Sequence, residues 1–408
     1  MEQVIKQRIA DIQRGNLPAG YRKTKCGIIP DTWSCCQPKE IFSGKSIKNN
    51  DSELPVLSVT QENGVMLRSE MDKDISYKED SVSSYKRVDI GDFVISLRSF
   101  EGGIEYSQCQ GVVSPAYTIF SHSEDVDGNY YKYYFKTDFF IKKLNTAVYG
   151  IRDGKQIGFQ DFSNLFIHCP PLEEQRRIAD ILGYCDRVIA LKKELIAEKK
   201  KQKKALMQKL LNPDSDFRLP VIREKITQVH FNDICRFING RAYSQDELLE
   251  TGKYRVLRVG NLFTSDTWYF SNLELPNDKY CQKDDLLYAW SASFGPFIWQ
   301  GETTIYHYHI WKVEPCEHVD KMFLYHCLKY DAELLENSIQ GGTMSHITKE
   351  TMERRLCPFV GNLDLQKNIA DILSAADKEI DLLEQELSQQ EQKKKSLMQL
   401  LLTGTVRG

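Results

Sequence analysis

The chain contains the same helical sequence twice, and this repeat limits the folds that it can adopt. Residues Gln175–Leu211 begin with Gln-x-x-Ile-Ala-Asp-Ile-Leu and end with Lys-Lys-x-Leu-Met-Gln-x-Leu-Leu, and Gln366–Leu402 repeat both motifs. An aspartate also recurs inside each copy, as Asp186 and Asp377. The copies begin roughly 191 positions apart, nearly half of the 408-residue chain. This period predicts a globular domain, a long helix, a second globular domain and a second long helix.

Apolar residues in both helical segments recur in alternating steps of four and three, which is the heptad pattern of a coiled-coil seam. The seam is apolar at both ends and polar in the middle. Its predicted members are Ile178, Leu182, Cys185, Ile189, Ile196, Leu206 and Leu210 in the first helix, and Ile369, Leu373, Ala376, Ile380, Leu383, Leu387, Leu397 and Leu401 in the second. Two ordinary amphipathic helices, each packed on its own domain, are the alternative, but the unbroken stepping favours a coiled coil.

The order of segments predicts how the two helices pair. The first helix carries the chain from the first domain to the second, so a helix packed against it must run in the opposite direction. A helix of about 37 residues is on the order of 55 Å long. The predicted fold class is therefore α+β: two strand-rich domains, each followed by a long helix, with the helices forming an antiparallel coiled coil with pseudo-two-fold symmetry.

Breakers and turn signals give the domain boundaries. An N-terminal helical segment (1–17) ends near Pro18 and Gly20, and a strand-rich first domain (18–170) ends at Pro170-Pro171. The central helix (171–212), the second strand-rich domain (213–360) and the C-terminal helix with its tail (361–408) follow. Similar short segments, Leu54–Val59 and Tyr254–Val259, indicate that the two strand-rich domains are diverged copies.

Composition excludes several protein classes. The formal net charge is −3, so only local patches could bind nucleic acid. The N-terminus is charged and no apolar run approaches the ~18 residues of a membrane span. Eleven cysteines, an odd number with irregular spacing and no secretory signal, predict reduced thiols in the cytoplasm.

No catalytic motif is complete. Gly44-Lys45-Ser46 lacks the glycine five positions earlier that a phosphate-binding loop needs, and no Gly-x-Gly-x-x-Gly cofactor motif occurs. His307, His309, Cys316 and His318 lack the spacing of a zinc site, so we expect no metal and no catalytic residue.

The polar residues of the two strand-rich domains fit DNA better. Arginine and lysine bind guanine edges and phosphates, and asparagine and glutamine bind adenine edges. Basic or amide residues near predicted turns, with interleaved aromatic residues, form the candidate DNA-binding set. Its members are Lys45, Lys48, Arg68, Arg98, Arg152, Lys155 and Gln156 in the first domain, and Arg241, Tyr243, Arg258, Asn261, Gln340, His346 and Lys349 in the second. Lysine runs on the helices, such as Lys199–Lys201 and Lys393–Lys395, are expected to be solvated.

This arrangement resembles the specificity subunit of type I restriction–modification systems, on the evidence of the repeated helical motif along the whole chain. Supporting segments are Gly27–Trp33, Gly111–Tyr117 and Leu400–Gly404. One departure is that the tail ends soon after Arg407, which suggests that the closure between N- and C-terminal segments is lightly built.

The resemblance implies a non-catalytic, sequence-specific DNA-recognition subunit. Each target-recognition domain would read one half of a bipartite DNA site, and the coiled coil would set the half-site spacing. Its partners would be double-stranded DNA, two modification (methyltransferase) subunits and two restriction (ATP-dependent translocase and nuclease) subunits. S-adenosylmethionine, ATP and Mg²⁺ would bind those subunits, and this chain would hold no cofactor. A stand-alone DNA-binding protein and a coiled-coil assembly scaffold are the alternatives.

Overall fold

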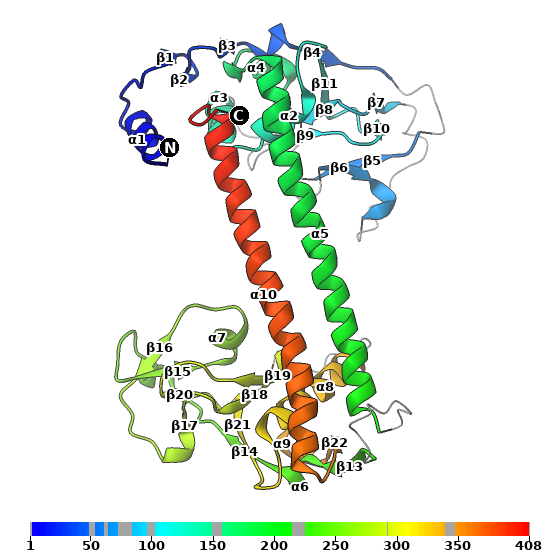
Figure 1. Ribbon diagram of the computed structural model, residues 1–408, viewed down its shortest axis with the longest axis vertical. Coiled ribbons are helices and arrows are strands. Elements are labelled where there is room, and N and C mark those ends of the chain that lie inside the picture. The colour runs from blue at the N-terminus through cyan, green and yellow to red at the C-terminus, as the bar shows by residue number, and fades with distance from the viewer. Residues whose placement is uncertain are drawn as a thin grey trace. The chain divides into compact units, whose positions relative to one another are not determined.

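The computed structural model divides the chain into two compact units. Unit 1 comprises Met1–Lys192 with Glu386–Gly408, and unit 2 comprises Lys193–Gln385 (Figure 1). The structure describes residues 2–48, 54–60, 64–71, 84–95, 103–148, 157–213, 225–291, 293–338 and 347–407.

Unit 1 contains a four-stranded antiparallel sheet in the order β4-β11-β8-β9. A second group pairs β5 with β6 and β7 with β10, and a parallel bridge between Val56 and Val112 joins the two pairs. The bounds are β4 Phe42–Lys45, β5 Leu57–Thr60, β6 Gly64–Leu67, β7 Lys86–Val88, β8 Phe93–Ile95, β9 Ile104–Tyr106, β10 Gly111–Val113 and β11 Thr118–His122.

Unit 2 repeats this topology strand for strand. Its antiparallel sheet has the order β14-β21-β18-β19, and its second sheet, β16-β15-β20-β17, joins β15 and β20 in parallel. The bounds are β14 Cys235–Asn239, β15 Tyr254–Leu257, β16 Tyr269–Ser271, β17 Tyr280–Cys281, β18 Leu286–Ser291, β19 Ser293–Ile298, β20 Thr304–Tyr306 and β21 Ile310–Pro315. The matching strand orders confirm that the strand-rich domains are diverged copies, as the short sequence similarities predicted.

Short helices and strands complete each unit. Unit 1 has α1 Glu2–Gln13, β1 Tyr21–Thr24, β2 Gly27–Pro30, β3 Ser34–Cys36, α2 Gly128–Tyr134, α3 Asp138–Val148, α4 Phe159–Ser163 and β12 Ile167–Cys169. Unit 2 has β13 Thr227–His230, α6 Phe231–Ile234, α7 Val259–Phe263, α8 Lys321–Ser338, α9 Lys349–Arg354 and β22 Leu356–Phe359. In each unit a two-stranded sheet, β3-β12 or β13-β22, leads directly into one of the long helices.

The two long helices are α5, Leu172–Leu211, and α10, Leu363–Leu402, each of 40 residues. Glu173 and Glu174 in the first turn of α5 favour the positive end of the helix dipole. Asn362 caps α10 by accepting a hydrogen bond from the Leu365 backbone N–H at 3.0 Å. After α10 ends, Gly404 adopts a φ of 72°, the left-handed conformation in which glycine commonly closes a helix.

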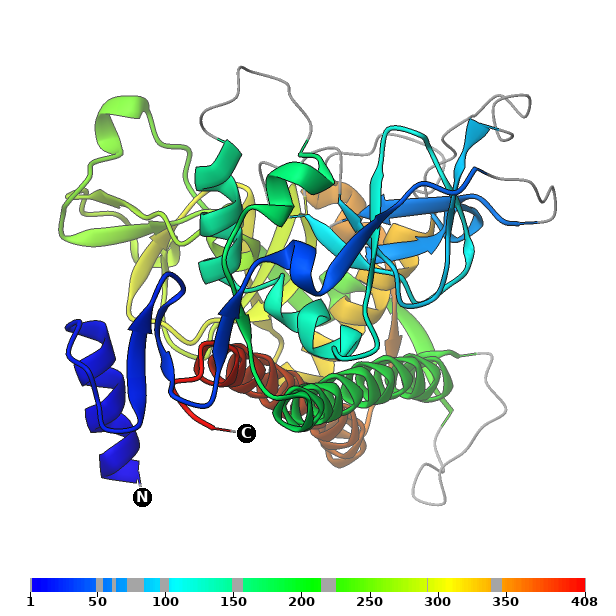
Figure 2. The same cartoon turned by 90° about the horizontal axis from the view of Figure 1, so that it is seen from above.

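Within each unit, the segments of α5 and α10 pack antiparallel. In unit 1, Lys192 pairs with Glu386 and Asp186 pairs with Lys394. In unit 2, Lys199 pairs with Glu379. Residue numbers rise along one helix as they fall along its neighbour, which defines an antiparallel coiled coil. In both views the end of α10 lies beside the start of α5 (Figure 1, Figure 2).

Every residue of the predicted seam is buried or half-buried. Lysines occupy its polar middle: Lys192, Lys199 and Lys203 follow the same heptad steps, and each forms an ion pair with an acidic residue of α10. The middle of the coiled coil is therefore held by charge pairs, and its ends belong to the apolar cores of the two units.

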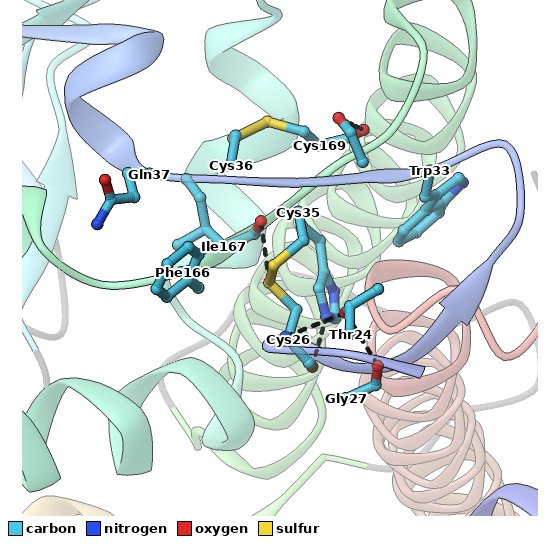
Figure 3. Close-up of a disulfide and its surroundings, with 12 residues drawn as sticks. Thr24, Cys26, Gly27, Trp33, Cys35, Cys36, Gln37, Phe166, Ile167 and Cys169 are labelled. Carbon is cyan, nitrogen blue, oxygen red and sulfur yellow. Dashed lines mark hydrogen bonds between the residues drawn. A yellow bond between two sulfur atoms is a disulfide. The ribbon is translucent and has the colours of Figure 1, made fainter. Parts of the chain in front are cut away.

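Cysteine pairing differs from the sequence prediction. Cys26 is bonded to Cys35 and Cys36 to Cys169, with Cα–Cα distances of 6.1 and 6.2 Å (Figure 3). Adjacent residues on a strand point to opposite faces, so Cys35 and Cys36 on β3 reach different partners. The prediction of reduced thiols is wrong for these four cysteines, because the β1–β2 hairpin and the β3–β12 pairing bring distant sulfur atoms together.

The N- and C-terminal segments of unit 1 meet at the start of α5. Trp33 donates its indole N–H to Glu174 at 3.0 Å, and Arg407 donates two hydrogen bonds to the same carboxylate at 2.7 and 2.8 Å. Tyr21 donates its hydroxyl to the Gly404 carbonyl at 2.9 Å. The closure is thus densely built, in contrast to the light closure that the short tail suggested.

No helix in the described ranges has the length and apolarity that a membrane span requires.

Candidate nucleic-acid interface

In unit 2, the turn between β20 and β21 gathers aromatic and basic side chains. The turn is formed by His307, Tyr308 and His309, here called the histidine turn. Arg241 lies beside it, because its backbone N–H donates to the Tyr306 carbonyl at 3.1 Å and its carbonyl accepts from the Tyr308 N–H at 3.0 Å. Backbone bonds therefore bring a residue that follows β14 to a turn more than sixty positions later in the chain.

Aromatic rings packed in tilted and edge-to-face arrangements extend this turn into a surface. The ring centroids of Tyr308 and His309 are 3.9 Å apart, and Trp290 lies 5.0 Å from His309. Trp290 donates its indole N–H to the Tyr308 carbonyl at 2.8 Å, which holds the indole against the turn. The Tyr308 side chain is exposed. Exposed rings with polar edges can stack on bases or sugars while offering hydrogen bonds.

Charge at this surface is modest and partly satisfied within the protein. Arg241 donates two hydrogen bonds to Glu247, at 2.9 and 2.7 Å, and lies 5.1 Å from the Tyr243 ring. Arg258 lies 4.2 Å from the Tyr269 ring. Burial, followed by the nearby His309 and Arg258, lowers the pKa of His307 to about 4, so this ring is neutral at pH 7. The His307 Nδ1 accepts from the His309 backbone N–H at 3.4 Å, so the Nε2–H is the ring group left to donate to a groove edge.

Unit 1 carries a basic and aromatic group at the equivalent connection, between β10 and β11. Lys86 donates to the Tyr117 carbonyl at 2.8 Å, and Lys48 forms a backbone bridge with Lys86. The Lys48 side chain is exposed and that of Arg68 is partly buried near Tyr117. Both units therefore have basic residues and at least one tyrosine near the same connection of the shared topology.

Besides Arg241, three predicted DNA-binding residues have side chains that are bonded to other parts of the protein: Lys45, Asn261 and Lys349. Lys45 forms ion pairs with Asp89 at 2.7 Å and Asp92 at 2.5 Å, and its side chain is only 15% exposed. The Asn261 amide accepts from the Arg258 N–H and donates to the carbonyls of Ser265 and Thr267, so it shapes a loop.

Lys349 pairs with Glu353 within α9 at 3.5 Å. These three side chains would have to exchange existing bonds before contacting DNA.

The remaining predicted residues lie outside the described part of the chain: Arg98, Arg152, Lys155, Gln156, Gln340 and His346. The described residues hold no group of three or more histidine, cysteine or acidic side chains that could bind a metal. Of the basic residues on the helices, Lys199 and Lys200 pair with Glu379 and Glu384 across the coiled coil.

Sequence reasoning did not select Tyr308 or Lys86, and it considered His307 and His309 only as metal ligands. A signal was present: Tyr306–His309 reads Tyr-His-Tyr-His and begins at the last residue of β20. A run of ring-bearing residues in a turn indicates a stacking surface more readily than a zinc site.

Comparison with known proteins identifies the family. The model of the type I restriction modification DNA specificity domain matches residues 35–200 and again residues 223–392. The Methanocaldococcus jannaschii protein named as a specificity subunit of the type I restriction enzyme MjaX is 24% identical, and the match covers 95% of this chain and 96% of that protein.

Two solved structures share the fold. The S subunit of a type I restriction–modification system from M. genitalium aligns with a TM-score of 0.55 at 18% identity, covering 91% of this chain and 96% of that chain. A chain from a structure of type I restriction–modification complex assembly aligns with a TM-score of 0.59 at 13% identity, covering 93% and 99%. The twofold family match along most of the chain agrees with the repeated topology, and we conclude that the chain belongs to the type I restriction–modification specificity subunits, non-catalytic targeting subunits that recognise DNA sequence.

Proposed function

We propose that each strand-rich domain reads one half of a bipartite DNA target through the connection that follows its parallel bridge. This connection is the histidine turn in target-recognition domain 2 (213–360) and Ser114–Tyr117 in target-recognition domain 1 (18–170). The observation that carries the proposal is that the duplicated topology puts basic and aromatic residues at this same connection twice. Two copies of one reading surface suit two half-sites of different sequence.

We further propose that the coiled coil sets the distance between half-sites. A continuous helix of 40 residues is roughly 60 Å long. Half-sites one helical turn apart lie ~34 Å centre to centre, which is within the reach of such a helix pair. Removing one heptad from both helices should change the spacer that the complex accepts and leave each half-site sequence unchanged.

The helices also carry a repeated apolar surface suited to partner subunits. Ile181 and Leu191 are exposed on α5, and Ile372 and Leu382 are exposed on α10. These residues occupy the same positions in the two copies of the helical repeat. Two similar surfaces can bind two identical partners, so we propose that two modification subunits dock here and that two restriction subunits join the full complex.

The catalytic reactions of the complex would then take place on the partner subunits. S-adenosylmethionine would bind the modification subunits and ATP with Mg²⁺ the restriction subunits, with no cofactor on this chain. The complex would act on chromosomal DNA in the cytoplasm. A stand-alone DNA-binding protein remains the second candidate, and tight, sequence-specific binding by the purified chain without partners would favour it. An assembly scaffold without a DNA role is the third.

The direct test is to map methylated adenines in cells with and without this gene. The proposal expects one bipartite motif to disappear when the gene is deleted. Replacing residues 18–170 with another recognition domain should change one half of that motif. No change in the methylation pattern on deletion would contradict the proposal.

A matched pair of variants tests the reading surface. Tyr308→Ala should weaken DNA binding by the assembled complex roughly tenfold or more, because stacking on one base contributes about 1–3 kcal/mol. Tyr184→Ala removes the same type of side chain from α5, at a position that is more exposed than Tyr308. We expect it to spare DNA affinity and to affect only partner docking. Equal effects of the two variants on DNA affinity would argue against the histidine turn as the reading surface.

A further inference from the structure

The aspartate that recurs in the helical repeat has a structural role that coiled-coil pairing alone does not require. In unit 1, Asp186 on α5 accepts a hydrogen bond from Lys394 of α10 at 2.5 Å. It also accepts one from the Tyr133 hydroxyl at 2.7 Å. Tyr133 belongs to α2 of target-recognition domain 1, so one carboxylate joins both helices to the recognition domain.

Unit 2 repeats the junction with different chemistry. Asp377 on α10 pairs with Lys203 of α5 and with Lys329 of α8, the latter at 3.2 Å. Lys329 belongs to target-recognition domain 2. Lys203 and Lys394 occupy the same position in the two copies of the helical repeat, as do Asp186 and Asp377. The duplicated element is therefore a three-way junction: an aspartate, a lysine of the opposite helix and a donor of the recognition domain.

The unit 2 junction is largely shielded from water, whereas the unit 1 junction is partly exposed, with side-chain exposures of 38% for Asp186 and 23% for Lys394. The Lys203 side chain is 7% exposed and Asp377 is 25% exposed. Burial works to raise the pKa of Asp377, but the bonds from Lys203 and Lys329 hold it below its ordinary value, so the carboxylate is charged. Burial and the bond to Asp186 raise the pKa of Tyr133, so the hydroxyl keeps the proton that it donates. Partly buried, charge-assisted hydrogen bonds are directional and stronger than exposed ones.

Other ion pairs across the helices provide a contrast. Lys200 pairs with Glu384 at 2.7 Å, with side-chain exposures of 58% and 45%. This pair joins α5 to α10 and includes no residue of a recognition domain. Exposed pairs of this kind contribute little to orientation, because each side chain exchanges the bond for water at little cost.

We propose that Asp186 and Asp377 are positioning residues that fix the angle at which each recognition domain leaves the coiled coil, and thereby the DNA spacer that the complex accepts. This inference rests on the proposed function. A carboxylate that accepts from an element on each side restricts rotation of the domain about the helix, whereas the apolar contacts nearby are non-directional. The recurrence of the aspartate in both helices follows from this role.

The test uses the complete complex with its modification subunits and a DNA library. The library holds the native half-sites separated by random spacers of different lengths, and methylation is read by sequencing. Asp377→Asn and Asp186→Asn should leave the half-site sequences unchanged. They should raise methylation at spacers one base pair longer or shorter, relative to the native spacer, by roughly tenfold, which corresponds to about 1.4 kcal/mol. Glu384→Gln is the matched control and should keep the wild-type spacer profile.

Two results would overturn the inference: an unchanged spacer profile in the asparagine variants, or the same broadening in Glu384→Gln. If an asparagine variant does not fold, Tyr133→Phe and Lys329→Met remove only the donor from the recognition domain and are judged by the same criterion. Asp377→Glu should restore the narrow profile in part. A wild-type complex that methylates no bipartite site would instead refute the proposed function.

Discussion

The two units share one topology, but the contacts at the start of the long helix differ between them. At the start of α5, Glu174 is buried and bonded to Trp33 and Arg407, which bring in the N- and C-terminal segments. At the equivalent position of α10 stands Leu365, which packs in an apolar core. The fold that the two units share therefore does not require hydrogen bonds at the start of its long helix. Unit 1 has them because two chain segments must be secured there.

The units also differ in the side chains that α2 and α8 place beside Asp186 and Asp377. Tyr133 and His326 each stand six residues after a capping aspartate, Asp127 before α2 and Asp320 before α8. The Tyr133 hydroxyl reaches Asp186, whereas the His326 Nδ1 is 4.0 Å from Asp377 and Lys329 supplies the bond. Unit 1 therefore uses a neutral donor and unit 2 a charged one with a buried imidazole beside it.

The largest expected difference between the units concerns the closure. Trp33→Ala should lower the stability of unit 1 by about 3–5 kcal/mol, because a fully buried indole and its bond to Glu174 are lost together. Ile226→Ala, at the matching position of unit 2, should cost that unit less, since no polar group loses a partner. Hydrogen exchange followed by mass spectrometry on each variant would locate the loss. Equal destabilisation of both units by Trp33→Ala would contradict the comparison.

The second-largest expected difference between the units is their loss of stability in the presence of a reducing agent. Both disulfides lie in unit 1, and the Cys36–Cys169 bond closes a loop with a sequence separation of 133. Its reduction should destabilise unit 1 by about 2–4 kcal/mol, because the unfolded chain regains freedom. Unit 2 holds only free cysteines among its described residues and should not respond.

Alkylation without reductant checks the premise of that experiment. Cys26, Cys35, Cys36 and Cys169 should react only after reduction and denaturation. Labelling of these four cysteines in unreduced protein would show that the bonds are absent in solution.

The smallest expected effect is the loss of stability of unit 2 at acidic pH. Burial lowers the pKa of His326 to about 4, with Asp377 opposing the shift and Lys203 and Lys329 adding to it. The unfolded state, with an ordinary value of 6.5, then binds the proton more tightly than the folded state. Stability is therefore complete above about pH 6.5 and falls as the pH drops toward 4, by at most about 3 kcal/mol.

Unit 2 should lose hydrogen-exchange protection in this pH window. His326→Gln should reduce the pH dependence without abolishing it, because the pKa of His307 in the same unit is also lowered to about 4. Tyr133 does not titrate there, so the unit 1 junction offers no matching contribution, although burial also lowers the pKa of His168 elsewhere in unit 1. A pH dependence that is unchanged in His326→Gln would remove His326 as its cause.

The helical repeat by itself determined the framework of the protein. Heptad spacing is a local property, since positions three and four apart always share a helix face, so the segments that became α5 and α10 were predictable from their residues. The order of the segments made an antiparallel pair the expected arrangement. The repeat also marked Asp186 and Asp377 before their partners were known.

Only the tertiary structure decided which polar side chains are available. Lys45 carries suitable chemistry for DNA but is bonded to Asp89 and Asp92, which lie more than forty positions later in the chain, and a single sequence does not encode such pairings locally. Cys36 and Cys169 likewise meet only because β3 pairs with β12. Long-range pairings depend on register and packing across the whole domain, so the histidine turn and the three-way junctions emerged only when the strands and helices were in place.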